Sequence, residues 1–270
     1  MSEKYTKIDN LRIRYRDSGG NKPLLLLLHG WGANADLFRY IEEYVSSVYR
    51  AVSPDIAGFG KSEEPDHAYD LDDYVDFIRD FVHKLYEDEK EELPKDIIIL
   101  GHSHGGRCLI RLLSRAARGE DFGFGVKKAV LVDSAGIKAV QSKEQLKRTD
   151  RYKRYKSFLI KSGLSRLFPS LIDKLQKKYG SADYAAASPV MRQSMVKVVN
   201  CDLKEEMPFI KIPVLLIWGD IDTATPLSDG KIMEELMPEA GLAVIQGAGH
   251  YSFLDNVNLF NRILGSFLGI

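Results

Sequence analysis

The chain has 270 residues, of which 44% are hydrophobic and 28% are charged, a composition typical of a soluble globular protein. Lys plus Arg and Asp plus Glu each number 38, so the net charge provides no argument for binding nucleic acid or an anionic membrane. At this length we expect one α/β domain that carries an insertion, in a monomer or a homodimer.

The sequence indicates neither a membrane span nor a metal site. The first ten residues have no apolar core, and the longest purely apolar run, residues 24–28, is far short of the ~20 residues that span a bilayer. The two cysteines, Cys108 and Cys201, are far apart and lack the spacing of metal ligands. We therefore expect a cytoplasmic protein without a cofactor, a metal or a disulfide.

Short apolar runs alternate with helical patterns along most of the chain. Residues 5–8 and 11–15 are close enough to form an antiparallel hairpin at the edge of a sheet, and six longer apolar runs follow. Such continuous runs are typical of strands that are covered on both faces. The clearest helical pattern follows Asp70, a plausible N-cap. The alternation predicts an α/β fold whose central sheet is mostly parallel and flanked by helices. The six runs are residues 23–29, 49–55, 96–103, 127–134, 213–220 and 241–249.

The alternation breaks in the second half of the chain. Residues 138–207 contain no convincing buried strand, only amphipathic stretches such as YKSFLIKSGLSRLF and SPVMRQSMVKVV. We interpret residues 1–137 and 208–270 as a core domain and residues 138–207 as a helical insertion, between the strand near 127–134 and the strand near 213–218. Because ligands bind at the carboxyl ends of parallel strands, an insertion that leaves from such an end would cover the site as a lid.

Charge is distributed unevenly despite the neutral total. Residues 63–92 contain thirteen acidic and three basic side chains, whereas residues 138–178 contain thirteen basic and three acidic side chains. Two solvated helical faces explain such a pattern most simply. The alternatives are that the basic segment docks on the acidic one, or that it attracts anionic substrates.

The pentapeptide GHSHG, residues 101–105, is the first chemical motif. It follows the apolar run IIIL directly and precedes the helical stretch GGRCLIRLLSRAAR. A sharp turn between a strand and a helix exposes the serine of such a motif, and its glycines permit the close packing that the turn requires. We therefore predict that Ser103 is a nucleophile.

A serine nucleophile needs a general base and a third group that orients the base. Of the six histidines we favour His250, because it follows the last predicted strand in GAGHYSF, where glycines form a loop that can present an imidazole. His102 is expected to support the turn, and His104 to act through its backbone amide with its side chain at the pocket floor. His29 is expected to shape its loop by hydrogen bonds. The others, His67 and His83, lie in the acidic segment, where solvated histidines are expected.

The orienting acid is expected after the preceding strand, in WGDIDTATP, which contains Asp220 and Asp222. Asp222 lies further into the loop and has more reach towards His250. Asp133, at the end of AVLVD, is a weaker candidate because a carboxylate there can equally accept hydrogen bonds from loop amides.

Two backbone N–H groups are expected to stabilise the oxyanion. The residue after the nucleophile, His104, supplies one amide by the geometry of the turn. The loop HGWG after the first long strand supplies the other, for which Trp31 is the best candidate.

With these motifs the chain resembles the α/β-hydrolase superfamily over nearly its whole length. The resemblance depends on HGWG (29–32), DIAGFGKS (55–62), GHSHGG (101–106), WGDIDTATP (218–226) and GAGHYSF (247–253), in that order. It implies that the nucleophile, acid and histidine of a catalytic triad are Ser103, Asp222 and His250, and that the insertion is a helical cap domain. The family's G-x-x-D pattern also favours Asp222 over Asp220.

The resemblance implies a serine hydrolase that acts on carboxylic ester-type bonds of small molecules through an acyl-enzyme. A serine nucleophile argues against haloalkane dehalogenases and epoxide hydrolases, which use aspartate, and GHSHG does not match the elbow of proline-releasing peptidases. Hydrolysis of carbon–carbon bonds in ring-fission products remains an alternative, since Tyr251 partly matches the aromatic residue that often follows the histidine of that class. A receptor that only binds its ligand is the alternative from another class. Candidate pocket residues are His29, Tyr251, Phe158 and Met191.

Overall fold

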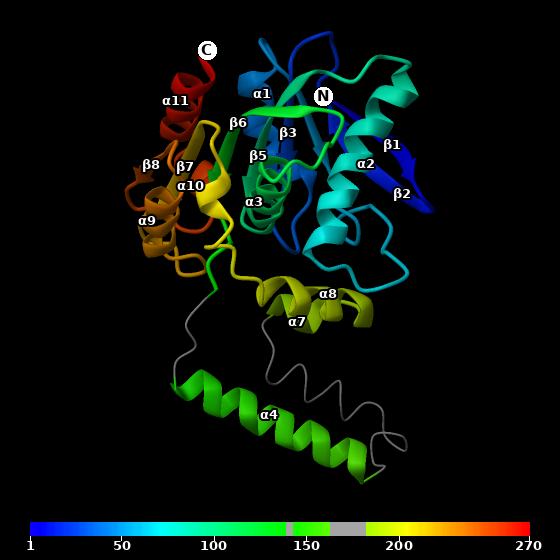
Figure 1. The fold of residues 1–270 in the computed structure, drawn as a ribbon, viewed down its shortest axis with the longest axis vertical. Coiled ribbons are helices and arrows are strands. Elements are labelled where there is room, and N and C mark those ends of the chain that lie inside the picture. The colour runs from blue at the N-terminus through cyan, green and yellow to red at the C-terminus, as the bar shows by residue number, and fades with distance from the viewer. Residues whose placement is uncertain (139–142, 163–181) are drawn as a thin grey trace.

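Eight strands form one sheet in the structure, a computed structural model that describes residues 1–138, 143–162 and 182–270 (Figure 1). The strand order is β1-β2-β4-β3-β5-β6-β7-β8, and the six strands from β4 to β8 run parallel. The first two strands form the predicted antiparallel hairpin at one edge. The strands are β1 (Ser2–Ile8), β2 (Leu11–Asp17), β3 (Leu24–Leu28), β4 (Arg50–Pro54), β5 (Asp96–His102), β6 (Gly125–Val132), β7 (Val214–Gly219) and β8 (Ala240–Ile245).

Helices cover both faces of the sheet, which explains why the central strands are apolar throughout. In β3, Leu24, Leu26 and Leu28 face a core that includes α2, α3 and α9, while Leu25 and Leu27 face a second core with α1 and α11. Successive side chains of a strand point to opposite faces, so a strand between two helical layers buries every residue. The helices of this core, with two 3-10 turns, are η1 (Ala35–Phe38), α1 (Arg39–Val45), α2 (Leu71–Glu89), α3 (His104–Ala117), η2 (Met207–Phe209), α9 (Leu227–Leu236), α10 (Ser252–Asp255) and α11 (Val257–Leu268).

The helix that the sequence predicted after Asp70 is present as α2. The Asp70 side chain accepts hydrogen bonds from the backbone amides of Asp72 and Asp73, and the Asp73 side chain accepts one from the Asp70 amide. This reciprocal arrangement is a capping box, which pairs N–H groups that a helix leaves without partners at its start. The apolar stripe of α2 is buried against α3 and the sheet.

Three helices lie between β6 and β7 in the described part of the chain: α4 (Lys143–Lys161), α7 (Ala182–Ala186) and α8 (Pro189–Val199). In Figure 1, α4 lies beyond α7 and α8, on the side away from the sheet. The core contacts α8 directly, because Arg107 of α3 donates a hydrogen bond to the Val198 carbonyl at 2.7 Å. The predicted insertion, residues 138–207, includes 139–142 and 163–181, which lie outside the described residues, so its extent as a domain stays a prediction.

Acidic side chains of residues 63–92 form ion pairs with α3 and within α2. Arg115 of α3 contacts Asp76 at 2.8 Å and Asp72 at 3.5 Å, and Lys84 contacts Glu87 within α2 at 2.8 Å. Among the described residues, no ion pair joins this segment to the basic one, whose described lysines and arginines on α4 are mostly exposed. Because residues 139–142 and 163–178 of the basic segment lie outside the described residues, the choice between docking and two separate charged surfaces stays a prediction.

Candidate active site

Ser103 lies at a sharp turn between β5 and α3. Its φ of 51° and ψ of −111° place it in a region that residues with a side chain rarely adopt. Two backbone hydrogen bonds hold the turn, from the Ser103 amide to the Val132 carbonyl at 3.1 Å and from the Ala135 amide to the Ser103 carbonyl at 3.0 Å. The turn leaves the Ser103 side chain half-buried at the carboxyl end of β5.

Glycines at this turn allow backbone segments to approach closely. A Cβ on Gly105 would collide with the Leu28 and His29 carbonyls, and a Cβ on Gly101 would lie 2.6 Å from the Gly105 carbonyl. Gly105→Ala is therefore expected to destabilise the fold by about 2–3 kcal/mol, as overpacking in a core does. Thermal or denaturant unfolding measures this loss.

The matched control is Gly241→Ala in β8, where an added Cβ meets no atom within 4 Å. This variant should unfold within about 0.5–1 kcal/mol of the wild type, on the stable side, since alanine restricts the unfolded chain. Equal unfolding free energies for the two variants would contradict the proposed packing at the turn.

The structure brings Ser103, His250 and Asp222 into one hydrogen-bonded chain. His250 Nε2 lies 3.0 Å from Ser103 Oγ, and His250 Nδ1 lies 2.8 Å from Asp222 Oδ2. Because an ionised carboxylate only accepts, the hydrogen of the neutral imidazole lies on Nδ1, and Nε2 accepts from the Ser103 hydroxyl. Each side chain follows a different parallel strand, so all three converge at the carboxyl edge of the sheet.

The Asp222 carboxylate is held ionised by its donors. Burial alone would raise its pKa, but hydrogen bonds from His250 and from Thr225 outweigh this effect and lower the pKa below its usual value. Thr225 contributes its hydroxyl at 2.7 Å and its amide at 3.1 Å, and the Ala224 amide donates at 2.7 Å. The carboxylate therefore presents a fixed negative charge to the imidazole. The other candidate acid, Asp220, instead accepts a hydrogen bond from the Gly247 amide.

Asp133 accepts hydrogen bonds from backbone amides of loops. This was the alternative to a role as the orienting acid. It accepts from the Gly219 amide at 2.8 Å and from the Ser252 amide and hydroxyl at 3.0 and 2.6 Å. Burial raises its pKa to about 6 in spite of these donors. Asp133 thus joins the ends of β6 and β7 to the segment that follows His250.

His102 supports the loop that carries His250, and its expected support of the turn stays a prediction. Its Nε2 donates to the His250 carbonyl at 2.8 Å, and its ring packs 4.9 Å from the His250 ring and 5.1 Å from the Tyr251 ring. Burial lowers the pKa of His102 to about 3, so the ring is neutral.

His29 is committed to the backbone of its own loop. Its Nδ1 donates to the Gly30 carbonyl at 2.8 Å, and its Nε2 accepts from the Ile56 amide at 2.9 Å. The ring is fully buried, and burial lowers its pKa to about 4. The loop-shaping expectation agrees with these contacts. Both ring nitrogens are thus bonded to backbone groups, and the place of His29 among the pocket residues stays a prediction.

The loop 29–32 lies directly against the nucleophile. A Cβ on Gly30 would lie 3.1 Å from the Ser103 Cβ, and the Trp31 ring contacts the His104 ring edge-on at 5.2 Å. Within the described residues, the backbone amides of Trp31 and His104 donate to no protein acceptor. Two unpaired N–H groups therefore flank the turn that carries Ser103.

The remaining pocket candidates differ in their positions. Tyr251 is 40% exposed, with its ring 5.5 Å from the His250 ring. Met191 of α8 is buried over Gly58, whose added Cβ would contact its sulfur. Phe158 lies on α4 and is 61% exposed, and none of its described contacts joins it to the site. Tyr251 and Met191 stay candidates, and Phe158 has no support from these contacts.

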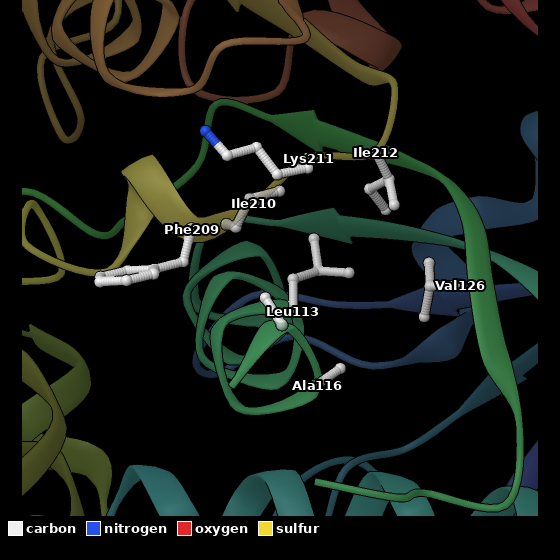
Figure 2. A pocket seen from close by; sticks show the side chains of 8 residues that line it. Leu113, Ala116, Val126, Phe209, Ile210, Lys211 and Ile212 are labelled. Atoms are coloured by element: carbon white, nitrogen blue, oxygen red, sulfur yellow. The ribbon is translucent and has the colours of Figure 1, made fainter. Parts of the chain in front are cut away.

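A surface pocket of about 350 Å³ lies elsewhere, beside the end of α3 that is remote from Ser103 (Figure 2). Its lining is mostly apolar, with Leu113 and Ala116 on one side and Phe209 and Ile210 on the other. None of the predicted site residues lines it. In the described part of the chain, no cluster of His, Cys, Asp or Glu could hold a metal ion, and no helix is long and apolar enough to cross a membrane.

Comparisons with known proteins identify the family. Residues 23–257 match the alpha/beta hydrolase fold family, and the chain therefore belongs to it. The AB hydrolase superfamily protein YisY of Bacillus subtilis is 23% identical, with 96% of each chain covered. A pimeloyl-[acyl-carrier protein] methyl ester esterase of Aliivibrio fischeri is 26% identical over 94% of this chain and 96% of its own.

A solved structure, that of a bromoperoxidase from Bacillus anthracis, superposes with a TM-score of 0.72. It is 24% identical, and both chains are covered completely. At this identity the likeness shows the fold alone. The family match and the fold together place the chain among the α/β hydrolases.

Proposed function

We propose that this protein is a serine hydrolase that cleaves carboxylic ester-type bonds of small molecules through an acyl-enzyme. The observation that carries the proposal is the pair of hydrogen bonds on His250, 3.0 Å to Ser103 Oγ and 2.8 Å to Asp222 Oδ2. A nucleophile, a base and an orienting carboxylate in this order provide what acyl transfer requires.

Each group has a defined task in the proposed reaction. His250 Nε2 takes the proton of Ser103 as the hydroxyl oxygen attacks the ester carbon, and Asp222 stabilises the imidazolium that forms. The imidazolium then gives the proton to the leaving alcohol, which leaves an acyl group on Ser103. A water molecule, deprotonated by His250, attacks this acyl-enzyme, and the carboxylic acid departs.

The unpaired amides of Trp31 and His104 are the proposed oxyanion donors. Preorganised donors stabilise the negative charge that develops on the carbonyl oxygen, and removing one such donor typically costs about 10²–10³-fold in rate. Both donors are backbone groups, so a side-chain substitution at these positions would change the shape of the pocket and leave the N–H in place.

An ester is favoured over a carbon–carbon bond because the relatives include esterases and lipases by name. The test is a panel that compares short-chain p-nitrophenyl esters with a vinylogous dienol of the ring-fission type. We expect the esters to give the higher kcat/KM. Faster turnover of the dienol than of every ester would contradict the ester proposal and support the alternative.

A further inference from the structure

Asp133, directly after β6, contacts the ends of two elements that border the site. The residue is fully buried, and both of its carboxylate oxygens accept hydrogen bonds. Its Oδ1 accepts from the Gly219 amide at 2.8 Å, and its Oδ2 accepts from the Ser252 amide at 3.0 Å and hydroxyl at 2.6 Å. One carboxylate therefore joins the last residue of β7 to the first residue of α10, two positions after His250.

The backbone of Asp133 also contacts the residue that holds the acid of the proposed triad. The Thr225 hydroxyl has both the Asp133 carbonyl, at 3.0 Å, and Asp222 Oδ2, at 2.7 Å, within hydrogen-bond distance. His250 Nδ1 lies 2.8 Å from the same Asp222 oxygen. Asp133 is thus linked to the carboxylate through Thr225, and to the imidazole through the backbone that Ser252 anchors.

The backbone at Asp133 has an uncommon conformation that directs its side chain. Its φ is 43°, in the left-handed region, where aspartate and asparagine occur more often than most residues with a side chain. Its amide donates to the Ile217 carbonyl at 2.9 Å, so hydrogen bonding between β6 and β7 extends to this residue. Such a conformation persists where the surroundings fix it, and here it directs the carboxylate towards Gly219 and Ser252.

The carboxylate of Asp133 is mostly ionised at neutral pH. Burial raises its pKa to about 6, the nearby charge of Asp222 adds to this effect, and the hydrogen bonds from Ser252 and Gly219 oppose it. An ionised carboxylate only accepts, so every one of these donors finds an acceptor. An amide in its place has a single acceptor oxygen, and either the Gly219 or the Ser252 backbone amide would then face an NH₂ group.

The segment that carries His250 depends on such backbone contacts for its position. The His250 side chain is 21% exposed, so packing alone does not fix the direction of its imidazole. His102 donates to the His250 carbonyl at 2.8 Å, and Asp133 binds the amide and hydroxyl of Ser252. The backbone is therefore held on both sides of Tyr251. A displacement of reacting groups by about 1 Å can cost about 10²-fold in rate.

We propose that Asp133 is a positioning residue, whose carboxylate fixes the segment of His250 against the loop of Asp222 and so keeps the imidazole within reach of Ser103. This inference rests on the proposed function. It assigns to Asp133 an effect on kcat that acts through His250, and no effect on substrate binding, because the carboxylate is fully buried among protein donors.

Asp133→Asn tests the carboxylate, because asparagine keeps the size of the side chain and tolerates the left-handed backbone. On a short-chain p-nitrophenyl ester we expect kcat to fall by about 10²-fold, as a small displacement of the imidazole would cause, and KM to stay within about threefold. Thermal unfolding establishes the temperature range in which the variant is folded, and all rates are measured within it.

Glu42→Gln is the matched control. Glu42 is another fully buried carboxylate that accepts from a serine hydroxyl, that of Ser53 at 2.9 Å, and it pairs with Arg16 at 2.9 Å. None of these three residues belongs to the candidate site. This variant should lose stability against unfolding, because it leaves Arg16 without its charged partner in the core, and it should keep the wild-type kcat.

Ser252→Ala is the milder variant, and it decides the question if Asp133→Asn does not fold. It removes the hydroxyl donor and leaves both backbone amides bonded to the carboxylate. We expect kcat to fall by about tenfold, the size of one hydrogen bond to a charged group, with KM unchanged. Because both side chains act through one contact, the double variant should lose no more than about the loss of Asp133→Asn alone.

NMR of protein labelled at the histidine ring nitrogens reports on the imidazole directly. The His250 signals are identified by their absence from the spectrum of His250→Ala. We expect the wild-type ring to carry its hydrogen on Nδ1, bonded to Asp222. The ring in Asp133→Asn should show averaged nitrogen shifts, because that bond is then made for only part of the time. Glu42→Gln should keep the wild-type signals.

The outcomes separate this inference from the proposed function. A kcat near that of the wild type in both Asp133→Asn and Ser252→Ala, a loss confined to KM, an equal loss in Glu42→Gln, or unchanged His250 signals in Asp133→Asn would overturn the positioning role. Ester turnover that neither variant slows would leave hydrolysis supported. A wild-type protein that hydrolyses no ester, with His250 signals that change in Asp133→Asn, would contradict hydrolysis and support positioning.

Discussion

Ser103→Ala is expected to lower kcat on the best ester by about 10⁴- to 10⁶-fold. The variant lacks the oxygen that forms the acyl-enzyme, and the imidazole 3.0 Å from that oxygen then has no proton to take. His250→Ala should cost a similar factor, since the hydroxyl alone is a poor nucleophile at neutral pH. Initial rates at saturating substrate measure both losses.

The double variant of Ser103 and His250 distinguishes one catalytic unit from two independent contributions. If the two side chains act together, the double variant loses no more than about the larger single loss. His67→Ala is the control, because His67 is exposed in the acidic segment, and it should retain wild-type rates. Losses that multiply, or a Ser103→Ala protein with full activity, would contradict the mechanism.

Asp222→Asn is expected to lower kcat by about 10⁴-fold while leaving the fold intact. The carboxylate accepts from His250 Nδ1 at 2.8 Å, whereas an amide can donate there and favour the wrong tautomer of the imidazole. That tautomer carries its hydrogen on Nε2 and cannot accept the proton of Ser103. The measurement is kcat against pH for the variant and the wild type.

Asp220→Asn provides the matched comparison in the same loop. Its Oδ1 accepts from the Gly247 amide at 2.6 Å, and asparagine retains an acceptor for that bond. This variant should stay within a few-fold of the wild type. A large loss in Asp220→Asn, together with a small loss in Asp222→Asn, would contradict the assignment of Asp222 and would show that Asp220 orients His250.

Much of the fold could be predicted because the signals are local. The run of five leucines in β3 predicts a strand buried on both faces, and the structure places its leucines alternately in two cores. Asp70 and the apolar spacing after it predict α2, whose capping box depends only on neighbouring residues. The strand β6 starts at Gly125, two residues before the predicted start. Hydrogen bonding to β5, which begins at the pair Asp96 and Gly125, determines where β6 starts, and the apolar run does not.

The candidate site could be predicted where a motif places a residue at the end of a strand. Ser103, Asp222 and His250 each follow a predicted strand, and parallel strands bring such residues together. Thr225 was missed, although a threonine three residues after an aspartate is a common turn pattern whose hydroxyl and amide meet the carboxylate.

The most direct test of the central claim is covalent labelling with a fluorophosphonate, followed by mass spectrometry of the intact protein and of its peptides. The account predicts one adduct per chain, on the peptide that carries Ser103, and no adduct in Ser103→Ala or, at matched times, in His250→Ala. A wild-type protein that binds esters yet takes no label would contradict the account and indicate a receptor. A label on any other serine would place the nucleophile elsewhere.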